Sequence, residues 1–154
     1  MQSRMKSPAL TLPGVLPALR TIAQATETCG VPRTTLELVH LRAGQLNGCS
    51  VCVDMHARAL RKLGESDARL FAVAAWREAP YYTQPERAAL ALAEALTRLC
   101  SPDAIPDAVW EEAAKHFDEA ALGALVMSVA VANLWNRVNV ATRQVSGDWV
   151  AQYL

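Results

Sequence analysis

The sequence predicts an all-α fold of six or seven helices, and three features support this. Ala and Leu dominate the composition, whereas aromatic residues make up only 6% and β-branched runs are short, a mix that favours helix over sheet. Apolar residues recur at helical spacing, and helix-starting and helix-ending residues separate the periodic stretches. With 154 residues, 52% of them hydrophobic, the chain fits one domain over residues 1–154 with a substantial core.

Boundary signals place the helices along the chain. Residues 1–13 read as an arm with two prolines, and the core is expected over about residues 15–145. Gly30 fits a helix C-terminus, Asn47-Gly48 fits a turn between two helices, and residues 83–86 form a capping box with proline in the first turn. The predicted helices span residues 16–28, 34–46, 49–63, 66–76, 83–99, 106–116 and 119–145.

The last predicted helix is apolar on nearly all sides over residues 120–132. Such a helix lies either at the centre of a bundle or in a contact between subunits. A small domain this rich in apolar residues also favours burial of part of its surface against copies of itself. We therefore expect a homo-oligomer. No run has the ~18 consecutive apolar residues that a membrane span requires, so no membrane partner is expected.

Charge and cysteine content exclude several classes of protein. The formal net charge is zero and the sequence pI is about 6.8, which gives no sign of a basic face for nucleic acid. The apolar run that ends at Pro13 is too short for a signal-peptide core. Four cysteines are too few for a secreted disulfide scaffold of this length. A cytoplasmic, reducing compartment is expected, where a Cys-x-x-Cys pair is more often catalytic or metal-binding than a permanent crosslink.

The candidate chemistry lies on the helix that follows the Asn47-Gly48 turn. Cys49, Cys52 and His56 share one face there, because spacings of three and four residues bring side chains together on a helix. The Cα atoms of the two cysteines should lie roughly 5 Å apart, within the range of a disulfide. Cys49 stands at the helix N-terminus, where backbone amides and the helix dipole favour a thiolate.

Glu37 is expected to face His56 across the helical hairpin. Glu37 precedes the turn by about ten residues and His56 follows it by about nine, so the two positions are nearly equidistant from the turn. The predicted chain runs from Glu37 to His56 to Cys52. A carboxylate that orients an imidazole beside a thiol is the general arrangement of an activated nucleophile.

Two other interpretations of these residues remain open. One is a zinc site made by Cys49, Cys52, His56 and Glu37. Cys49 and His56 are separated by roughly 10 Å of helix rise, which is long for two ligands of one tetrahedral ion. The other is purely structural, with the cysteines as small core residues and His56 paired with Glu37.

Glu37, the run Cys49-Ser50-Val51-Cys52 and His56, at these spacings, resemble the carboxymuconolactone decarboxylase-like superfamily, and more closely its alkyl hydroperoxidase D-like branch. Residues 133–139 also resemble a segment of many members. The resemblance implies a helical domain that assembles into trimers or hexamers. It further implies a peroxiredoxin-type alkylhydroperoxidase that reduces hydroperoxides with thiols, with no bound cofactor or metal.

In the mechanism that this resemblance implies, Cys52 is the peroxide-attacking thiol, His56 and Glu37 move its proton, and Cys49 closes a Cys49–Cys52 disulfide. An external dithiol, of the lipoyl type in the best-understood relatives, then reduces that disulfide. The helix terminus instead favours Cys49 as the more acidic thiol, which conflicts with this assignment. Val51 stands where some relatives have a second histidine. A non-catalytic, redox-sensing or disulfide-exchanging oligomer is the alternative function.

Several other polar residues receive a structural interpretation. His40, three residues after Glu37, is expected to be an exposed or capped histidine rather than a member of the site. Cys29 and Cys100 are expected to be core thiols. A polar group near the end of the last helix lies either at the mouth of a pocket or in a subunit interface, and the interface is favoured: Trp135, Asn136, Arg137 and Asn139.

Overall fold

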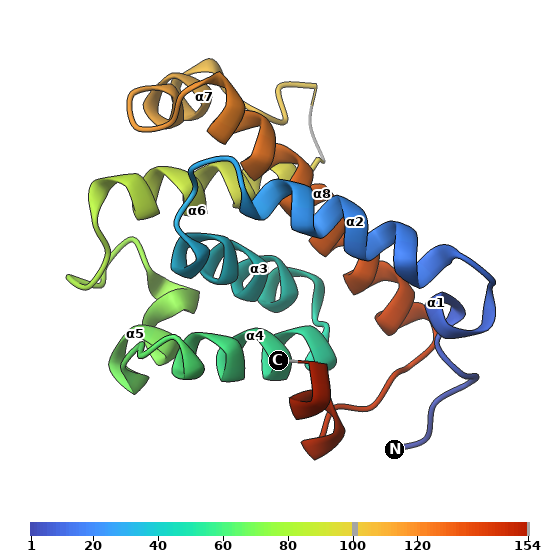
Figure 1. The fold of residues 1–154 in the computed structure, drawn as a ribbon. Coiled ribbons are helices and arrows are strands. Elements are labelled where there is room, and N and C mark those ends of the chain that lie inside the picture. The colour runs from blue at the N-terminus through green and yellow to red at the C-terminus, as the bar shows by residue number, and fades with distance from the viewer. Residues whose placement is uncertain (100–101, 154) are drawn as a thin grey trace.

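The computed structural model describes residues 1–99 and 102–153, and within them every regular element is helical (Figure 1). The predicted all-α fold is confirmed. Each of the seven predicted helices is present, and two short elements, α1 and η2, are added. The elements are α1 (Pro8–Thr11), α2 (Val15–Glu27), α3 (Arg33–Asn47), α4 (Ser50–Lys62), α5 (Asp67–Ala72), η1 (Val73–Ala75), α6 (Gln84–Thr97), α7 (Asp107–Ala114), α8 (Glu119–Ala141) and η2 (Asp148–Tyr153).

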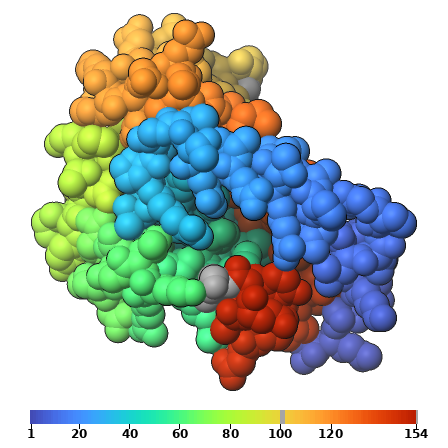
Figure 2. All heavy atoms as spheres, in the orientation of Figure 1, coloured from blue at the N-terminus to red at the C-terminus, as the bar shows by residue number. Residues whose placement is uncertain are grey.

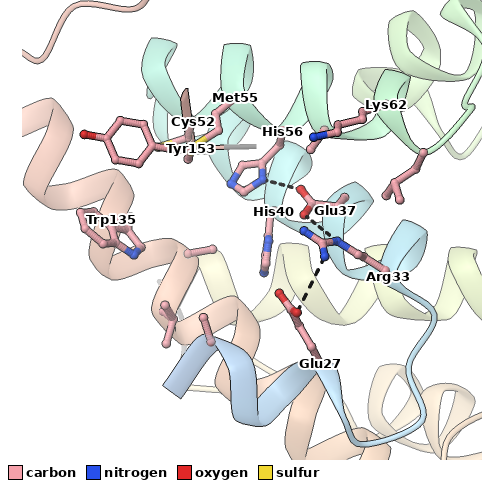
Figure 3. A pocket seen from close by; sticks show the side chains of 15 residues that line it. Glu27, Arg33, Glu37, His40, Cys52, Met55, His56, Lys62, Trp135 and Tyr153 are labelled. Carbon is pink, nitrogen blue, oxygen red and sulfur yellow. Dashed lines mark hydrogen bonds and ion pairs between the residues drawn. The ribbon is translucent and has the colours of Figure 1, made fainter. Parts of the chain in front are cut away.

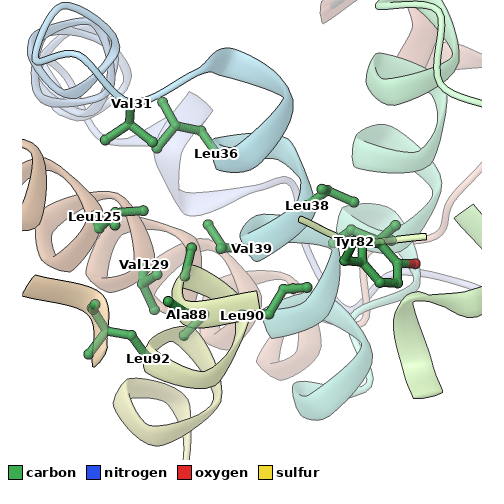
Figure 4. Close-up of a cluster of buried hydrophobic side chains, with 14 of the residues drawn as sticks. Val31, Leu36, Leu38, Val39, Tyr82, Ala88, Leu90, Leu92, Leu125 and Val129 are labelled. Carbon is green, nitrogen blue, oxygen red and sulfur yellow. The ribbon is translucent and has the colours of Figure 1, made fainter. Parts of the chain in front are cut away.

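The core lies where α3, α6 and α8 pack against one another (Figure 4). Leu38 and Val39 on α3, Leu90 on α6, and Leu125 and Val129 on α8 are almost completely buried. Burial of each such side chain stabilises the fold by about 1.5–3 kcal/mol relative to leaving it in water. The long helix α8 therefore packs in the core of the bundle, which is one of the two positions that its apolar composition predicts.

By length and composition alone, α8 is the one helix among the described residues that could cross a membrane. Half of its most apolar window is buried inside the bundle, against α2, α3 and α6. A core helix has the same composition, so the packing accounts for the apolar sequence.

Two glycines shape the hairpin of α3 and α4. Gly48 ends α3 in the left-handed conformation (φ 68°), and its N–H is donated to the carbonyls of Gln45 and Gly44. Gly44 lets the two helices approach closely, because a Cβ atom at this position would lie 3.3 Å from the Cβ of Cys52. The α3–α4 hairpin is thus fixed at the point where it carries the cysteine pair.

Side-chain caps fix the starts of α5, α6 and α8. Thr83 and Glu86 form the predicted capping box of α6. Ser66 accepts a hydrogen bond from the N–H of Arg69, and Asp118 accepts one from the N–H of Ala121. The predicted end of the last helix at residue 145 is wrong. Helix α8 ends at Ala141, and the chain then turns back toward α4.

From the sequence, the core is expected over about residues 15–145. Segments on both sides of that range also contact the bundle. The arm is anchored to the end of α8, because the N–H of Arg4 donates to the carbonyl of Thr142 (2.9 Å). At the other end, η2 packs against α4, and Val150 is fully buried in a cluster with Cys49, Val51 and Cys52. The C-terminal segment therefore forms part of the surroundings of the cysteine pair.

Candidate active site

Cys49 and Cys52 form a disulfide, with Cα atoms 5.3 Å apart, close to the predicted separation. Cys49 is the N-cap of α4, and its sulfur accepts a hydrogen bond from the N–H of Cys52 (3.2 Å). Both residues are only 1% exposed. The predicted position of Cys49 at the start of the helix is therefore correct, and the structure corresponds to the oxidised state of the pair.

Asn139 on α8 lies beside both sulfurs. Its Nδ2 is 3.5 Å from the Sγ of Cys52 and 3.8 Å from the Sγ of Cys49, within hydrogen-bond distance for sulfur. The side chain is buried, so the predicted interface role of Asn139 is wrong. An amide that donates to sulfur favours negative charge there, and hence a thiolate when the disulfide is reduced.

Glu37 and His56 meet across the hairpin as predicted. Glu37 Oε2 lies 2.7 Å from His56 Nδ1 (Figure 3). Burial alone would raise the pKa of Glu37. The hydrogen bond and charge of His56, with smaller contributions from His40 and Arg33, outweigh that effect and hold the pKa below its ordinary value of 4.5. The carboxylate therefore fixes the Nδ1 edge of the imidazole and leaves Nε2 for other partners.

His40 belongs to the same cluster, so its predicted role as an exposed or capped histidine is wrong. Its ring centroid lies 4.8 Å from that of His56, and its Nε2 lies 2.6 Å from Ser128 Oγ on α8. Burial, reinforced by the neighbouring His56, lowers the pKa of His40 to about 3. His40 is consequently neutral at physiological pH, and it packs as an uncharged ring behind the Glu37–His56 pair.

A pocket of about 630 Å³ opens beside these residues, and we call it the histidine pocket. Cys52, Glu37, His40 and His56 all line it. Its walls come from α2, α3, α4, α8 and η2, and Figure 2 shows the surface hollowed between α2, α4 and the C-terminal segment. The remaining wall includes the charged side chains of Glu27 and Arg33, the aromatic side chains of Trp135 and Tyr153, and the apolar side chain of Met55. A volume of this size admits a small organic substrate.

Within the described residues, one cluster of side chains has atoms that could bind a metal ion. Its members differ from the four residues of the zinc site that the sequence left open. Glu37, His40 and His56 offer ligand atoms within 4.8 Å of one another. Cys49 and Cys52 are joined to each other, so in this state neither sulfur is a free thiolate ligand. The hydrogen bond between Glu37 and His56 already uses one donor and one acceptor of the cluster.

Sequence comparison identifies the family of this chain. Residues 13–95 match the model of the carboxymuconolactone decarboxylase family. Uncharacterized protein YdfG of Bacillus subtilis (strain 168) is 38% identical over 116 residues, which are 75% of this chain and 78% of YdfG. The chain belongs to the carboxymuconolactone decarboxylase family.

Solved structures place this family member in the AhpD-like group of folds. A protein of unknown function from Agrobacterium tumefaciens, described as a candidate antioxidant defence protein AhpD, superposes with a TM-score of 0.86. It is 29% identical, and the match covers 95% of this chain and 99% of that one. The debrominase Bmp8 superposes with a TM-score of 0.78 at 19% identity, over 91% of this chain and 75% of Bmp8, and shares the fold.

The site of this carboxymuconolactone decarboxylase family member contains polar residues whose roles the sequence did not reveal. Asn47, at the end of α3, donates to the side-chain oxygens of Asn133 (2.9 Å) and Asn136 (2.8 Å) on α8. Asn136 is buried, so the interface predicted for it is wrong, whereas Trp135 lines the histidine pocket, the other position considered from the sequence. This asparagine network fixes the hairpin turn against the central helix.

Cys29 is not among the residues that line the histidine pocket. Cys29 is a free thiol that packs partly buried against the core, as predicted. Cys100 lies outside the described residues.

Proposed function

We propose that this protein is a thiol-dependent peroxidase that reduces hydroperoxides through the Cys49–Cys52 pair. One observation carries the proposal: Cys52 lines the same pocket as a histidine that is held by a buried carboxylate, and it is joined to a second cysteine one helical turn away. A thiol, a proton-transfer group and a resolving thiol are the three components that peroxide reduction by a cysteine pair requires. Family membership is consistent with this chemistry.

In the first step, the Cys52 thiol gives its proton to His56, and the thiolate attacks one peroxide oxygen. The O–O bond breaks as the S–O bond forms, so sulfur is oxidised to a sulfenic acid and the peroxide is reduced to an alcohol. His56 returns the proton to the leaving alkoxide. Glu37 stabilises the imidazolium that exists between these two proton transfers, because its lowered pKa keeps it ionised.

In the second step, the Cys49 thiolate attacks the sulfur of the Cys52 sulfenic acid. The S–O bond breaks, water leaves after protonation, and the disulfide forms. An external dithiol, of the lipoyl type or carried by a lipoyl protein, then returns the pair to two thiols. All of this chemistry takes place on sulfur, so the proposal requires no bound cofactor.

The pocket that each sulfur lines and the position of Asn139 favour Cys52 rather than Cys49 as the thiol that attacks peroxide. Cys52 lines the histidine pocket, whereas Cys49 does not, and the amide of Asn139 lies closer to the sulfur of Cys52. Cys52 therefore has His56 as a proton acceptor in the pocket that admits the substrate, and the amide of Asn139 as a hydrogen-bond donor to its thiolate. The helix-terminus effect at Cys49 then serves the second step, in which Cys49 must itself be a thiolate.

Val51 occupies the position of the second histidine of some relatives, and its side chain is buried in the cluster around Val150. The second imidazole near the site comes instead from His40 on α3. Because His40 is neutral at physiological pH, we assign it to positioning His56 rather than to carrying a proton.

We also propose a reducing, cytoplasmic location and a trimeric or hexameric assembly, as the family resemblance implies. Met127 on α8 and Trp110 on α7 are large apolar side chains that are more than 40% exposed in one chain, which suits contact with another copy. Light scattering after size-exclusion chromatography measures the assembly, and a monomer would contradict this part of the proposal.

Consumption of a hydroperoxide in the presence of excess dithiol tests the function. We expect turnover by the wild-type protein and background consumption by the Cys52→Ser variant. Equal consumption by the two proteins would reject the peroxidase, and would favour a redox-sensing or disulfide-exchanging role if the cysteine pair still cycled between its thiol and disulfide forms.

A further inference from the structure

A second pocket of about 540 Å³ opens on Cys49, and we call it the Cys49 pocket. Cys52, which lines the histidine pocket, is absent from its lining, and Cys49 is absent from the lining of the histidine pocket. The disulfide therefore forms a wall between two pockets, with a different sulfur toward each. Asn139 lies beside both sulfurs and lines the Cys49 pocket.

We propose that the two half-reactions use opposite sides of the disulfide: hydroperoxide enters through the histidine pocket, and the reducing dithiol attacks Cys49 through the Cys49 pocket. This inference rests on the proposed peroxidase function and adds to it the route of the reductant and the sulfur that it attacks. The attack site also follows from chemistry, because thiol–disulfide exchange places the attacking thiolate in line with the bond that breaks.

The composition of the two pockets fits this division. The histidine pocket contains Glu37 and His56, which handle protons and suit a step that must protonate a leaving alkoxide. Of the described residues that line the Cys49 pocket, Arg143 carries the one charged side chain, and Val51, Val140 and Val145 supply apolar surface. A lipoyl-type dithiol carries its thiolates on an alkyl chain. The cation of Arg143 suits the thiolate, and the apolar surface suits the alkyl chain.

Arg143 is placed for that role by an unusual backbone conformation. Its φ of 52° lies in the left-handed region, which is uncommon for a residue with a side chain. Within residues 1–99 and 102–153, no carboxylate forms an ion pair with its guanidinium. The charge of Arg143 is therefore available to attract an anionic nucleophile.

The proposed step balances in atoms and electrons. One thiolate of the dithiol attacks Cys49 Sγ, the S–S bond breaks, and Cys52 leaves as a thiolate that receives its proton from His56. The second thiolate of the reductant then attacks the reductant sulfur in the mixed disulfide and releases Cys49 as a thiolate. The reductant leaves as a cyclic disulfide, so two electrons pass from it to the cysteine pair.

The first test identifies the sulfur that is attacked. Wild-type protein is oxidised with diamide, which requires no peroxidase activity, and is then treated with the monothiol 2-mercaptoethanol, quenched by alkylation and analysed by peptide mass spectrometry. We expect the mercaptoethanol adduct on Cys49 and the alkyl group on Cys52. The reverse distribution, or equal amounts of both, would overturn the proposal.

The second test fills each pocket with a matched substitution on α8. Val140→Trp narrows the Cys49 pocket, Val131→Trp narrows the histidine pocket, and Leu134→Trp, which lines neither pocket, is the control. We measure the rate of disulfide reduction by dithiothreitol and the rate of oxidation of the reduced protein by hydroperoxide. Val140→Trp should lower the ratio of reduction rate to oxidation rate about tenfold, and Val131→Trp should raise it by about the same factor.

The possible outcomes separate this inference from the function on which it rests. A control with both rates within about twofold of wild type shows that an added tryptophan on α8 is tolerated. Equal effects of the two pocket variants on both rates would overturn the two-sided route while leaving the peroxidase intact. Failure of the wild-type thiols to react with hydroperoxide would instead reject the proposed function, and the mercaptoethanol adduct would still report which sulfur a thiol reaches.

Discussion

Glu37 Oε2 and His56 Nδ1 lie 2.7 Å apart, although 19 residues separate them in the chain and they belong to different helices of the hairpin. Gly44 and Gly48 bring α3 and α4 close enough for this contact. Because this hydrogen bond occupies Nδ1, the Nε2 edge of the imidazole faces away from the carboxylate and is the edge available to a substrate. The geometry of the α3–α4 hairpin therefore determines which nitrogen can exchange a proton in the histidine pocket.

Replacement of Glu37 by Gln should slow the reaction of the reduced protein with hydroperoxide by about 10²-fold, the usual contribution of a general acid–base group. The amide keeps the shape of the side chain but removes the charge that stabilises an imidazolium at His56. Stopped-flow oxidation of the reduced protein measures this rate. Glu27→Gln is the matched control, because Glu27 lines the same pocket and, like Glu37, pairs with Arg33, but it makes no hydrogen bond to His56. A similar loss in both variants would argue against a specific role for Glu37.

Replacement of Asn139 by Leu should raise the pKa of the Cys52 thiol in the reduced protein. The amide is positioned to donate to sulfur, and a hydrogen bond to a charged group contributes about 1.5–3 kcal/mol. Ultraviolet absorbance of the thiolate during a pH titration of the reduced protein reports this pKa. An unchanged titration would show that Asn139 does not stabilise the thiolate.

His40 should make the protein less stable as the pH falls below about 6.5. Its pKa is lowered to about 3 in the folded state, so between these two values the unfolded chain binds the additional proton. Stability is therefore complete above pH 6.5 and falls by up to about 1.4 kcal/mol per pH unit on acidification. Urea unfolding between pH 7 and pH 5 measures the slope. In the His40→Asn variant, the unfolding free energy should change less steeply with pH, by up to about 1.4 kcal/mol per pH unit. The same dependence on pH in both proteins would contradict a folded state in which His40 is uncharged.

The asparagine network should contribute measurably to stability. Asn47→Ala removes the donor to Asn133 and Asn136, and Asn136 is then left with a buried, unpaired oxygen, which costs about 1–3 kcal/mol. Asn136→Leu should cost less, because the Nδ2 of Asn136 already lacks a hydrogen-bond partner. Urea unfolding of the two variants provides the comparison. The opposite order of stabilities would show that the shape of Asn136, rather than its hydrogen bond, matters.

Much of this architecture follows from the sequence by local rules. The capping box at Thr83 and Glu86, the turn at Gly48 and the helical spacing of Cys49, Cys52 and His56 each depend on residues close together in the chain. The pairing of Glu37 with His56 needed only one further assumption, that the helices of a tight hairpin run antiparallel.

Other features of the site depend on contacts between distant segments, which spacing cannot reveal. The ring of His40 contacts Ser128, 88 residues away, and Asn139 reaches the sulfurs only because α8 crosses the hairpin. From the sequence alone, Asn136 is assigned to an interface, because nothing in the local sequence shows that Asn47, 89 residues away, donates a hydrogen bond to it. Val150 lies beyond the predicted core and contributes through a turn after α8.

Cys52 is proposed as the thiol that attacks peroxide. The most direct measurement uses the Cys49→Ser variant, in which the second step cannot occur, treated with hydroperoxide in the presence of dimedone, which traps sulfenic acids. Mass spectrometry should find a peroxide-dependent dimedone adduct on Cys52, and the Cys52→Ser variant should show none. An adduct on Cys49 in the Cys52→Ser variant, together with an unmodified Cys52 in Cys49→Ser, would contradict the account.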